Sequence, residues 1–314
     1  MKEGIISLGE ALIDFIPLDP DNISFQKSPG GAPANVAVGV ARLEAKSTFI
    51  GKVGNDVLGR FLKNTLEDYG VNTSSMLLTD DIRTGVVFVT LENGERSFDF
   101  YINPSADRFL TEEEIDEKLF DENKILHFGS ISLTSEPTRS ATIKAVKLAK
   151  EKGLTVSYDP NLRLGLWDSE VAAKEQIISM LPYADILKIS EEELEFMTGE
   201  KNIEKGADKL AKYDIPLLLV TLGSEGSYVF THEGHQHVPA RKVTTVDTTG
   251  AGDAFVSGIL YMANEWDGNI SAITLEKAVE MATFASVSGS LAASEKGAMT
   301  ALPSLEQVQS ILAK

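Results

Sequence analysis

The sequence predicts an α/β protein in which helices cover both faces of a mostly parallel central sheet and a small β-sheet forms a lid. From residue 124 onward, short apolar runs typical of buried strands alternate with segments of helical period, the pattern of a parallel sheet. Residues 84–103 alternate apolar and polar side chains instead, so they predict a separate hairpin. No Pro/Ser-rich linker divides the 314 residues, so the chain is expected to fold as one domain over residues 1–314.

The first seventy residues contain two predicted strands, each followed by a helix. Apolar runs mark the strands, and Val36, Val40 and Leu43 recur at helical spacing after a Gly-Gly-Ala-Pro turn. The predicted strands cover residues 4–8 and 47–54, and the predicted helices cover residues 32–43 and 56–69.

The hairpin is expected to turn at Asn93-Gly94, because this dipeptide is the strongest short signal for a tight β-turn. Folding the chain there gives one apolar face and one mixed face, as expected of a sheet that covers something. The pairs are Val89 with Phe98 and Val87 with Phe100 on the apolar face, and Phe88 with Asp99 and Val86 with Tyr101 on the mixed face. The lid is expected to comprise about residues 12–27 and 84–103.

The remaining elements follow the alternating rhythm of a parallel sheet. The predicted strands are 124–131, 154–160, 184–190 and 216–223, with a short hairpin over 226–239. The predicted helices cover about 136–152, a segment opening with "SEEELEFM" (190–197), and the final stretches 253–265, 275–293 and 304–313.

Composition and charge exclude several classes of function. The chain has 29 Lys+Arg against 47 Asp+Glu, a net charge of −18, which argues against nucleic acid or an anionic membrane as a partner. It has no cysteine, so neither a disulfide framework nor a thiol nucleophile is available, and a reducing cytoplasm is the expected location. Glu10 and Asp14 interrupt the apolar N-terminal stretch too early for a signal peptide, and no 18 apolar residues run together.

A glycine turn before a helix supplies the clearest chemical signal. The chain lacks both the G-x-x-x-x-G-K-[ST] loop and the G-x-G-x-x-G fingerprint after a strand. Gly250-Ala251-Gly252 instead exposes backbone N–H groups at the start of a helix, where the helix dipole favours an anion. Asp253 there is open to two interpretations: a helix N-cap, or a carboxylate that takes a hydroxyl proton as a phosphoryl group arrives. Asp247 places a second acid beside the turn.

Two motifs resemble those of the ribokinase-like (PfkB-type) carbohydrate kinases. "DTTGAGDAFVSG" (247–258) is similar to the C-terminal signature of the family, and "GGAPANVAVGVARLE" (30–44) is similar to its N-terminal one. The two motifs also occur in the order that the family shows, and the resemblance covers essentially the whole chain. Within the family, "GGAPANVA" and "DPNLRLGLW" (159–167) look most like fructokinases. The resemblance implies a ribokinase-like fold and ATP-dependent phosphorylation of a sugar primary hydroxyl, with Mg²⁺ and K⁺ as the implied metal ions.

The resemblance also assigns the reacting centre and the sugar site. It makes Asp253 the catalytic base and Gly250, Ala251 and Gly252 the anion hole. It places Asp14, Gly31 and Asn35 at sugar-binding positions. From the residues alone, Gly31 is also explained as a turn and Asn35 as a helix cap. Arg163 could reach a phosphate or pair with Asp159.

For the nucleotide, the resemblance implies a role for "VTLGSEGSYVF" (220–230), with Thr221, Gly223 and Gly226 near the phosphates and adenosine. A strand followed by a tight turn explains this stretch equally well. Ser190 and Ser286 stand where many relatives carry Asn, which puts their nucleotide roles in doubt. Glu193 is implied to act on Mg²⁺ through water, although Ser190 and Glu193 also form a capping box.

A monovalent cation site is implied beside the anion hole, formed by backbone carbonyls. The matching positions are Asp247, Thr249, Ala292, Glu295, Gly297 and Ala301. Separately, His232, His235 and His237 share a hairpin where they could hold a metal or simply form an exposed polar turn.

Other functions stay open at this level. Within the family these are 2-keto-3-deoxygluconate kinase, ribokinase and nucleoside kinase; ribokinases usually read Gly-Lys-Gly-Ala-Asn where this chain has "GAPAN" (31–35). Outside it, a non-catalytic sugar sensor and an NAD-dependent enzyme remain. The expected partners are a small sugar and a nucleotide, and the mixed face of the lid suggests a homodimer.

Overall fold

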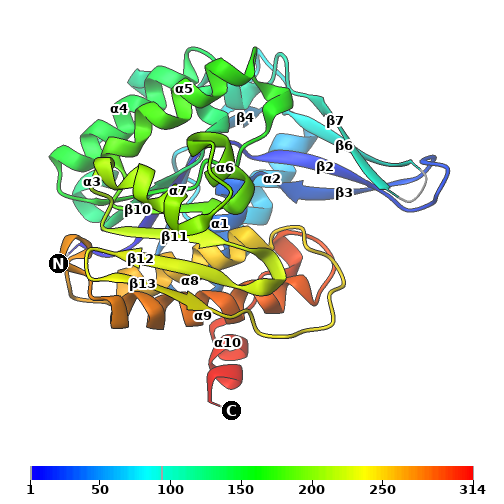
Figure 1. Ribbon diagram of the computed structural model, residues 1–314. Coiled ribbons are helices and arrows are strands. Elements are labelled where there is room, and N and C mark those ends of the chain that lie inside the picture. Colours follow the sequence, from blue (N-terminus) through cyan, green and yellow to red (C-terminus); the bar gives the residue numbers. More distant parts are fainter. Residues whose placement is uncertain (1, 93–94, 314) are drawn as a thin grey trace.

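The computed structural model describes residues 2–92 and 95–313, and two β-sheets organise them (Figure 1). The large sheet is parallel except at one edge, where β11, β12 and β13 pair antiparallel. In spatial order its strands are β13 (Gly234–Val238), β12 (Ser227–Thr231), β11 (Leu217–Thr221), β10 (Ile186–Ser190), β9 (Thr155–Tyr158), β8 (Ile125–Phe128), β1 (Ile5–Leu8), β4 (Ser47–Gly54) and β5 (Met76–Thr79). The predicted mostly parallel sheet is therefore confirmed.

Helices cover both faces of this sheet, as predicted (Figure 1). Alternate strand residues point to opposite faces, so Ile6 and Leu8 join one apolar cluster while Ile5 joins the other. The helices are α1 (Ala32–Arg42), α2 (Val57–Asp68), α3 (Leu119–Glu122), α4 (Thr138–Glu151), α5 (Glu170–Met180), α6 (Glu191–Thr198), α7 (Ile203–Leu210), α8 (Ala251–Glu265), α9 (Leu275–Ala293) and α10 (Leu305–Leu312). None of them, among the described residues, is long and apolar enough to cross a bilayer.

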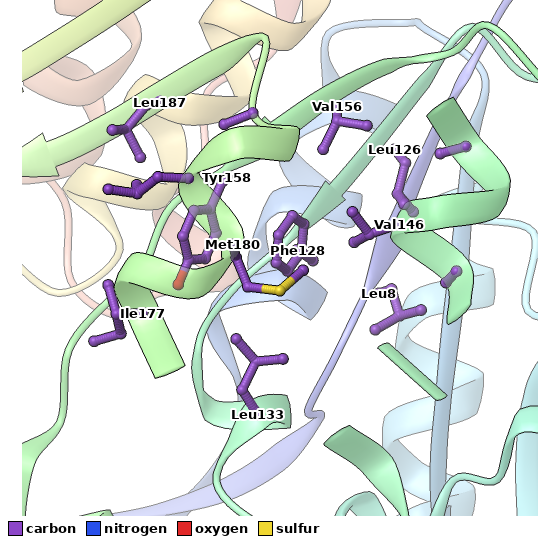
Figure 2. Close-up of a cluster of buried hydrophobic side chains, with 14 of the residues drawn as sticks. Leu8, Leu126, Phe128, Leu133, Val146, Val156, Tyr158, Ile177, Met180 and Leu187 are labelled. Atoms are coloured by element: carbon purple, nitrogen blue, oxygen red, sulfur yellow. The ribbon is translucent and has the colours of Figure 1, made fainter. Parts of the chain in front are cut away.

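Figure 2 shows the apolar cluster that contains Leu8, where side chains from the strands meet those of α4 and α5. Phe128 and Tyr158, from neighbouring strands, stack with ring centroids 4.5 Å apart. Met180 and Ile177 of α5 pack beside them. This packing fixes the carboxyl ends of β8 and β9, and the polar residues that follow both strands.

The small sheet consists of β3 (Phe25–Gly30), β2 (Leu12–Pro17), β6 (Val86–Glu92) and β7 (Glu95–Tyr101), in that order. It projects to one side of the large sheet, as the predicted lid should (Figure 1). The register predicted for the hairpin is confirmed, with Val89 opposite Phe98 and Val86 opposite Tyr101. The predicted turn at Asn93-Gly94 lies outside the described residues.

The predicted division of the hairpin into an apolar and a mixed face is only partly right. Phe98, assigned to the apolar face, is 53% exposed. Phe88, assigned to the mixed face, stacks on Phe15 at 4.9 Å and meets Phe25 and Tyr101 edge-on. The prediction considered only the hairpin, and β2 and β3 contribute the two additional rings.

Several elements differ from the sequence expectation. The strand predicted to reach residue 131 ends at Phe128, because the backbone and side chain of Ser130 both donate to the carbonyl of Pro160 and turn the chain. Helices α5 and α7 were not expected. In α7, Gly206 lies where a Cβ would come within 2.7 Å of the Leu194 side chain, so a weak helix former is required by close packing on α6.

Candidate active site

The glycine turn begins α8 and leaves backbone N–H donors outside the helical hydrogen bonds. Gly250 is the N-cap, with φ of 78°, a conformation that glycine adopts without strain. The amide of Ala254 donates to the carbonyl of Gly250 at 2.8 Å, so the amides of Gly252 and Asp253 precede the helical ladder. They are placed to donate to an anion at the positive end of the helix dipole.

Asp253 is not the helix cap, and that interpretation is wrong. The helix starts at Ala251, two residues earlier than predicted, so Asp253 lies inside the first turn. Its Oδ2 accepts a hydrogen bond of 2.7 Å from Nδ2 of Asn35. Asn35 in turn is not a cap either, because Gly31 occupies that position of α1. Burial raises the pKa of Asp253 to about 6, although the Asn35 hydrogen bond opposes this rise.

Asp14 lies on β2 opposite Val87 and faces the same site. Burial raises its pKa to about 6, the charge of Asp253 adds to the rise, and Arg163 opposes it. The charges of Asp253 and Arg163 are thus near enough to Asp14 to act on its pKa. Two neighbouring acids suit a ligand rich in hydroxyl groups, which can donate hydrogen bonds to carboxylates.

Gly31 bends the chain between the lid and α1. Its φ is 101°, and a Cβ there would come within 2.5 Å of the carbonyl oxygen of Glu10 and 3.0 Å of Cα of Ala11. Both are backbone atoms that cannot move aside. The turn interpretation of Gly31 is therefore right, and it is compatible with a backbone role beside a ligand.

Lys188 is a residue that sequence reasoning missed. It lies on β10 and donates to Oδ2 of Asp159 at 3.0 Å, and both side chains are nearly buried. The structure thus pairs Asp159 with Lys188, whereas Nη1 of Arg163 donates to the carbonyl of Leu162. A Cβ on Gly252 would lie 3.6 Å from Nζ of Lys188, so the ammonium group is close to the glycine turn. A single lysine within an apolar strand leaves no spacing pattern that could have revealed this.

A cleft of about 750 Å³ opens beside these residues. Its lining includes Arg163, Lys188, Ser190 and Glu193. The capping box is present, since the Ser190 hydroxyl accepts from the amide of Glu193 and Glu193 Oε2 accepts from the amide of Ser190. Oε1 of Glu193 accepts from the amide of Leu162 at 2.7 Å, so the carboxylate also ties α6 to the loop after β9.

The residues expected at the nucleotide lie on β11, in the turn between β11 and β12, and on α9. Thr221 ends β11, and its hydroxyl donates to the carbonyl of Ile189 on β10. Gly226 has φ of 108°, and a Cβ there would strike the carbonyl of Val238 at 2.1 Å. Gly223 has φ of 56°, and nothing lies within 4 Å of the position that a Cβ would occupy there. Ser286 of α9 donates to the carbonyl of Pro239 at 3.5 Å.

The acidic start of the glycine turn is tied to the loop after α9. Oδ1 of Asp247 accepts from the amide and hydroxyl of Thr249, and Oδ2 accepts from the amide of Gly297 at 3.3 Å. A Cβ on Gly250 would touch Ala298 of the same loop. The structure thus brings three of the expected cation positions together. The other three lie on the same returning segment, at Ala292, Glu295 and Ala301.

Two further buried carboxyls were not singled out as site residues from the sequence. Glu10 is 3% exposed, and burial raises its pKa to about 8. Asp107 is also buried, which raises its pKa to about 6, and its charge contributes to the shift of Glu10. Oε1 of Glu10 accepts from the amide of Ala32 at 3.3 Å, so it supports the turn at Gly31. Glu10 precedes β2 and Asp107 follows β7, so both lie where the lid joins the large sheet.

The raised pKa of Glu10 should be visible in stability. The folded protein keeps a proton that the unfolded chain releases, so the free energy of unfolding falls as pH rises from 4.5 to about 8. The slope is at most about 1.4 kcal/mol per pH unit. Glu10→Gln cannot titrate and is expected to flatten this dependence, most clearly above about pH 6, where Asp107 has largely titrated. Urea denaturation of both proteins at several pH values checks this, and parallel profiles would contradict it.

The fold and the site together define a class of enzyme. A carboxyl that can take a proton and a helix end that can hold an anion are what moving a phosphoryl group onto an alcohol requires, so the class is a phosphotransferase. The sequence pattern of the pfkB family of carbohydrate kinases matches residues 2–305, and the chain belongs to that family.

Known relatives agree with this assignment. The chain is 49% identical to a protein named probable fructokinase-6, chloroplastic, of Arabidopsis thaliana, over 99% of this chain and 82% of that protein. It is 43% identical to fructokinase-1 of Zea mays, over 100% and 98% of the two chains. The prediction of an ATP-dependent carbohydrate kinase most similar to fructokinases is confirmed.

Solved structures show the same fold. A fructokinase double mutant from Vibrio cholerae O395, described with fructose, ADP and potassium ion bound, has a TM-score of 0.91 and 41% identity, covering 99% of this chain and 98% of that one. Fructokinase from Xylella fastidiosa with bound ATP has a TM-score of 0.94 and 34% identity, covering 100% and 99%. The predicted ribokinase-like fold is thereby confirmed.

Proposed function

We propose that the protein transfers the γ-phosphoryl group of ATP to the primary hydroxyl of fructose and forms fructose 6-phosphate. The observation that carries this proposal is the buried Asp253, which Asn35 holds at the first turn of α8 beside two backbone amides that precede the helical ladder. The names of the relatives and the bound fructose and ADP of the Vibrio cholerae enzyme support fructose as the acceptor and ATP as the donor.

The roles proposed for the sugar site follow from these positions. Asp14, Gly31 and Asn35 bind the sugar from the lid and from the start of α1. Asp253 then orients the hydroxyl and takes its proton, and the raised pKa of this carboxyl improves it as a base near neutral pH. Arg163, whose charge acts on both Asp14 and Asp253, lies near the entering phosphate.

At the phosphoryl group, the turn formed by Gly250, Ala251 and Gly252 is proposed to stabilise negative charge. The amide of Gly252 is the main donor of this turn, since the amide of Ala251 donates to the carbonyl of Thr248 at 3.2 Å. Because such transition states are largely dissociative, positioning and charge stabilisation contribute more than the strength of the base. Closure of the lid over the sugar would exclude water and prevent hydrolysis of ATP.

The nucleotide is proposed to extend along the cleft, held by residues from β10, β11 and α9. These residues are Thr221, Gly223, Gly226, Ser190 and Ser286. Both carboxylate oxygens of Glu193 already accept backbone hydrogen bonds, and each keeps a second lone pair for a water molecule bound to Mg²⁺. Mg²⁺ would offset the charge of the phosphates.

A K⁺ site is proposed next to the glycine turn, at the loop that Asp247, Thr249 and Gly297 join. Carbonyl oxygens are suitable ligands for a hard cation, and the potassium described for the Vibrio cholerae enzyme supports this choice. The proposed set is completed by Ala292, Glu295 and Ala301.

Steady-state kinetics on a panel of acceptors tests the proposal. With ATP and Mg²⁺, kcat/KM is expected to be highest for fructose among fructose, ribose, 2-keto-3-deoxygluconate, inosine and aminoimidazole riboside. The last acceptor is included because a Salmonella enterica kinase for it has a TM-score of 0.87 to this chain. Replacing K⁺ by Na⁺ is expected to lower the rate. Binding of fructose without sugar phosphate formation would instead identify a sensor.

Three further proposals concern the whole chain. Residues 1–314 form one kinase domain that includes the lid. The chain works in the cytoplasm, although one relative is named chloroplastic.

Two copies of the chain join through the lid. Tyr101 is 63% exposed there, beside the ring of Phe88. Sedimentation of a Tyr101→Glu variant against the wild type tests this contact.

A further inference from the structure

We propose that a second cavity, beside the lid, binds a phosphorylated metabolite through Lys27 and Lys296. The cavity has a volume of about 330 Å³. Three parts of the chain enclose it: the lid strands β2 and β3, helix α2 with its C-cap, and the loop of residues 296–300 after α9. It shares no lining residue with the cleft of about 750 Å³ that Arg163 lines, so the two are separate sites.

The charge of this cavity is opposite to that of the whole protein. The chain carries a net charge of −18, yet the described lining contains two lysines and no aspartate or glutamate. Neither lysine belongs to an ion pair among the side chains that the structure describes, whereas Lys52, Lys150 and Lys188 each pair with an acid. Two positive charges without acidic partners suit a ligand of nearly two negative charges, and a phosphate monoester carries such a charge at neutral pH.

The ring of Phe61 holds the ammonium group of Lys27 in place. Nζ lies 3.6 Å from the centre of the ring, a cation–π contact, and the lysine is half-buried. The ring covers one side of the ammonium group, so N–H donors on the other side remain for an anion. Because the lysine is already ordered, less conformational entropy is lost when a ligand binds to it.

The loop that carries Lys296 is fixed by its own hydrogen bonds. The hydroxyl of Thr300 donates to the carbonyl of Lys296 at 3.1 Å, and the amide of Gly297 donates to Oδ2 of Asp247 at 3.3 Å. Lys296 itself is exposed, so a ligand from solvent can reach it. The two lysines therefore lie on separate ordered segments that a single anion can bridge.

The rest of the lining favours an organic phosphate ester over a bare phosphate ion. Apolar and aromatic side chains can pack against the C–H groups of a sugar, and Gln26 and Ser28 can bond its hydroxyls. The volume lies at the lower end of the range of about 300–1,000 Å³ for small-molecule sites, which suits a sugar phosphate. The apolar and aromatic lining residues are Ile16, Pro29, Phe61, Tyr69 and Met299.

A ligand in this cavity would also act on fructose binding, a consequence that rests on the proposed kinase function. Ser28 of β3 lies opposite Asp14, the acid proposed to bind the sugar. On the other side of the cavity, Ala298 supports the glycine turn, since a Cβ on Gly250 would come within 3.0 Å of its Cα. A ligand held by both segments favours the arrangement in which the lid and the glycine turn are close, and this arrangement binds fructose more tightly.

Calorimetric titration with glucose 6-phosphate tests the site, because this phosphate monoester is neither substrate nor product of the proposed reaction. The wild type should bind it, and Lys27→Met/Lys296→Met should bind it about 10-fold or more weakly, since each lysine donates charged hydrogen bonds. Methionine keeps an apolar stem over Phe61, so the variant should fold. Glucose and inorganic phosphate should each bind the wild type more weakly than glucose 6-phosphate.

Lys147→Met/Lys212→Met is the matched control. It removes the same charge, and Lys212 likewise lies over an aromatic ring, that of Tyr213, at 5.0 Å. This variant should bind glucose 6-phosphate as the wild type does. Without the probe, both double variants should keep wild-type kcat. Saturating glucose 6-phosphate should lower the KM for fructose about 5-fold or more in the wild type and the control, but not in Lys27→Met/Lys296→Met.

Four outcomes would overturn the inference. Three concern binding: no binding to the wild type, undiminished binding to Lys27→Met/Lys296→Met, and inorganic phosphate that binds as tightly as glucose 6-phosphate. The fourth is a KM for fructose that stays constant or rises with the probe, and a rise that persists in the variant would place the probe in the sugar site. Failure of the proposed function is distinguishable, because the wild type would then phosphorylate no acceptor of the panel while the titrations would still measure binding.

Discussion

Replacing Asp253 with asparagine is expected to lower kcat for fructose phosphorylation by about 10²- to 10⁴-fold, the range for loss of a general base. Asparagine preserves the size of the side chain, and its oxygen can still accept the hydrogen bond that Nδ2 of Asn35 donates at 2.7 Å. The shape of the sugar site is therefore kept, and fructose should bind almost as well. Steady-state kinetics and calorimetric titration with fructose measure the two quantities.

The pH dependence of kcat/KM is a second test of the role of Asp253. Burial raises the pKa of Asp253 to about 6, so wild-type kcat/KM should fall as pH drops through this value, because the protonated acid accepts no proton. The residual activity of Asp253→Asn should decline less steeply. Glu276→Gln neutralises a first-turn carboxylate of α9 and should keep wild-type kcat. Turnover near the wild-type level in Asp253→Asn would show that Asp253 is not the base.

The second large effect is expected at Gly31. In Gly31→Ala, the new Cβ would lie 2.5 Å from the carbonyl oxygen of Glu10, so the chain must shift on one side of the turn. The start of α1 would move, and Asn35 with it. We expect kcat/KM for fructose to fall by about 10²-fold, the effect of misplacing a reacting group by about 1 Å. The free energy of unfolding should fall by about 1–3 kcal/mol, measured by urea denaturation.

Gly153→Ala is the matched control for this prediction. Gly153 also has a positive φ, 72°, but nothing lies within 4 Å of its missing Cβ. This variant carries the backbone strain without the collision, so it should lose a little stability and no activity. Equal kinetics in the two variants would show that the close contact between Gly31 and Glu10 does not position the sugar site.

Local patterns predicted the parts of the fold that depend on local chemistry. Period-two alternation around Asn93-Gly94 predicted the correct pairing of Val89 with Phe98, because the register of a hairpin follows from the place of its turn. The same reasoning missed the rings of Phe15 and Phe25, which come from strands far away in the chain. It also missed α5, whose buried residues Ala173, Ile177 and Met180 do not stand out among equally apolar neighbours.

Prediction of the site from local sequence has the same limit. Glycines before a helix predicted an anion-binding turn from local chemistry, and the structure places Gly250 at the N-cap of α8. Nothing in the sequence around Lys188 indicates that its ammonium group reaches Gly252, because strand pairing decides it. Glu10 and Asp107 were missed likewise, since their burial depends on how the lid joins the large sheet.

The hydrogen bond between Asn35 and Asp253 joins residues 218 positions apart. During synthesis on the ribosome, Asn35 emerges long before Asp253, so a nascent chain that ends before α8 lacks the proposed base. If Asp253 is the base, as proposed, catalysis begins only when α8 has packed against α1. Recovery of turnover after dilution from denaturant consequently measures assembly of the entire chain, and no folding intermediate lacking that contact should contribute to it.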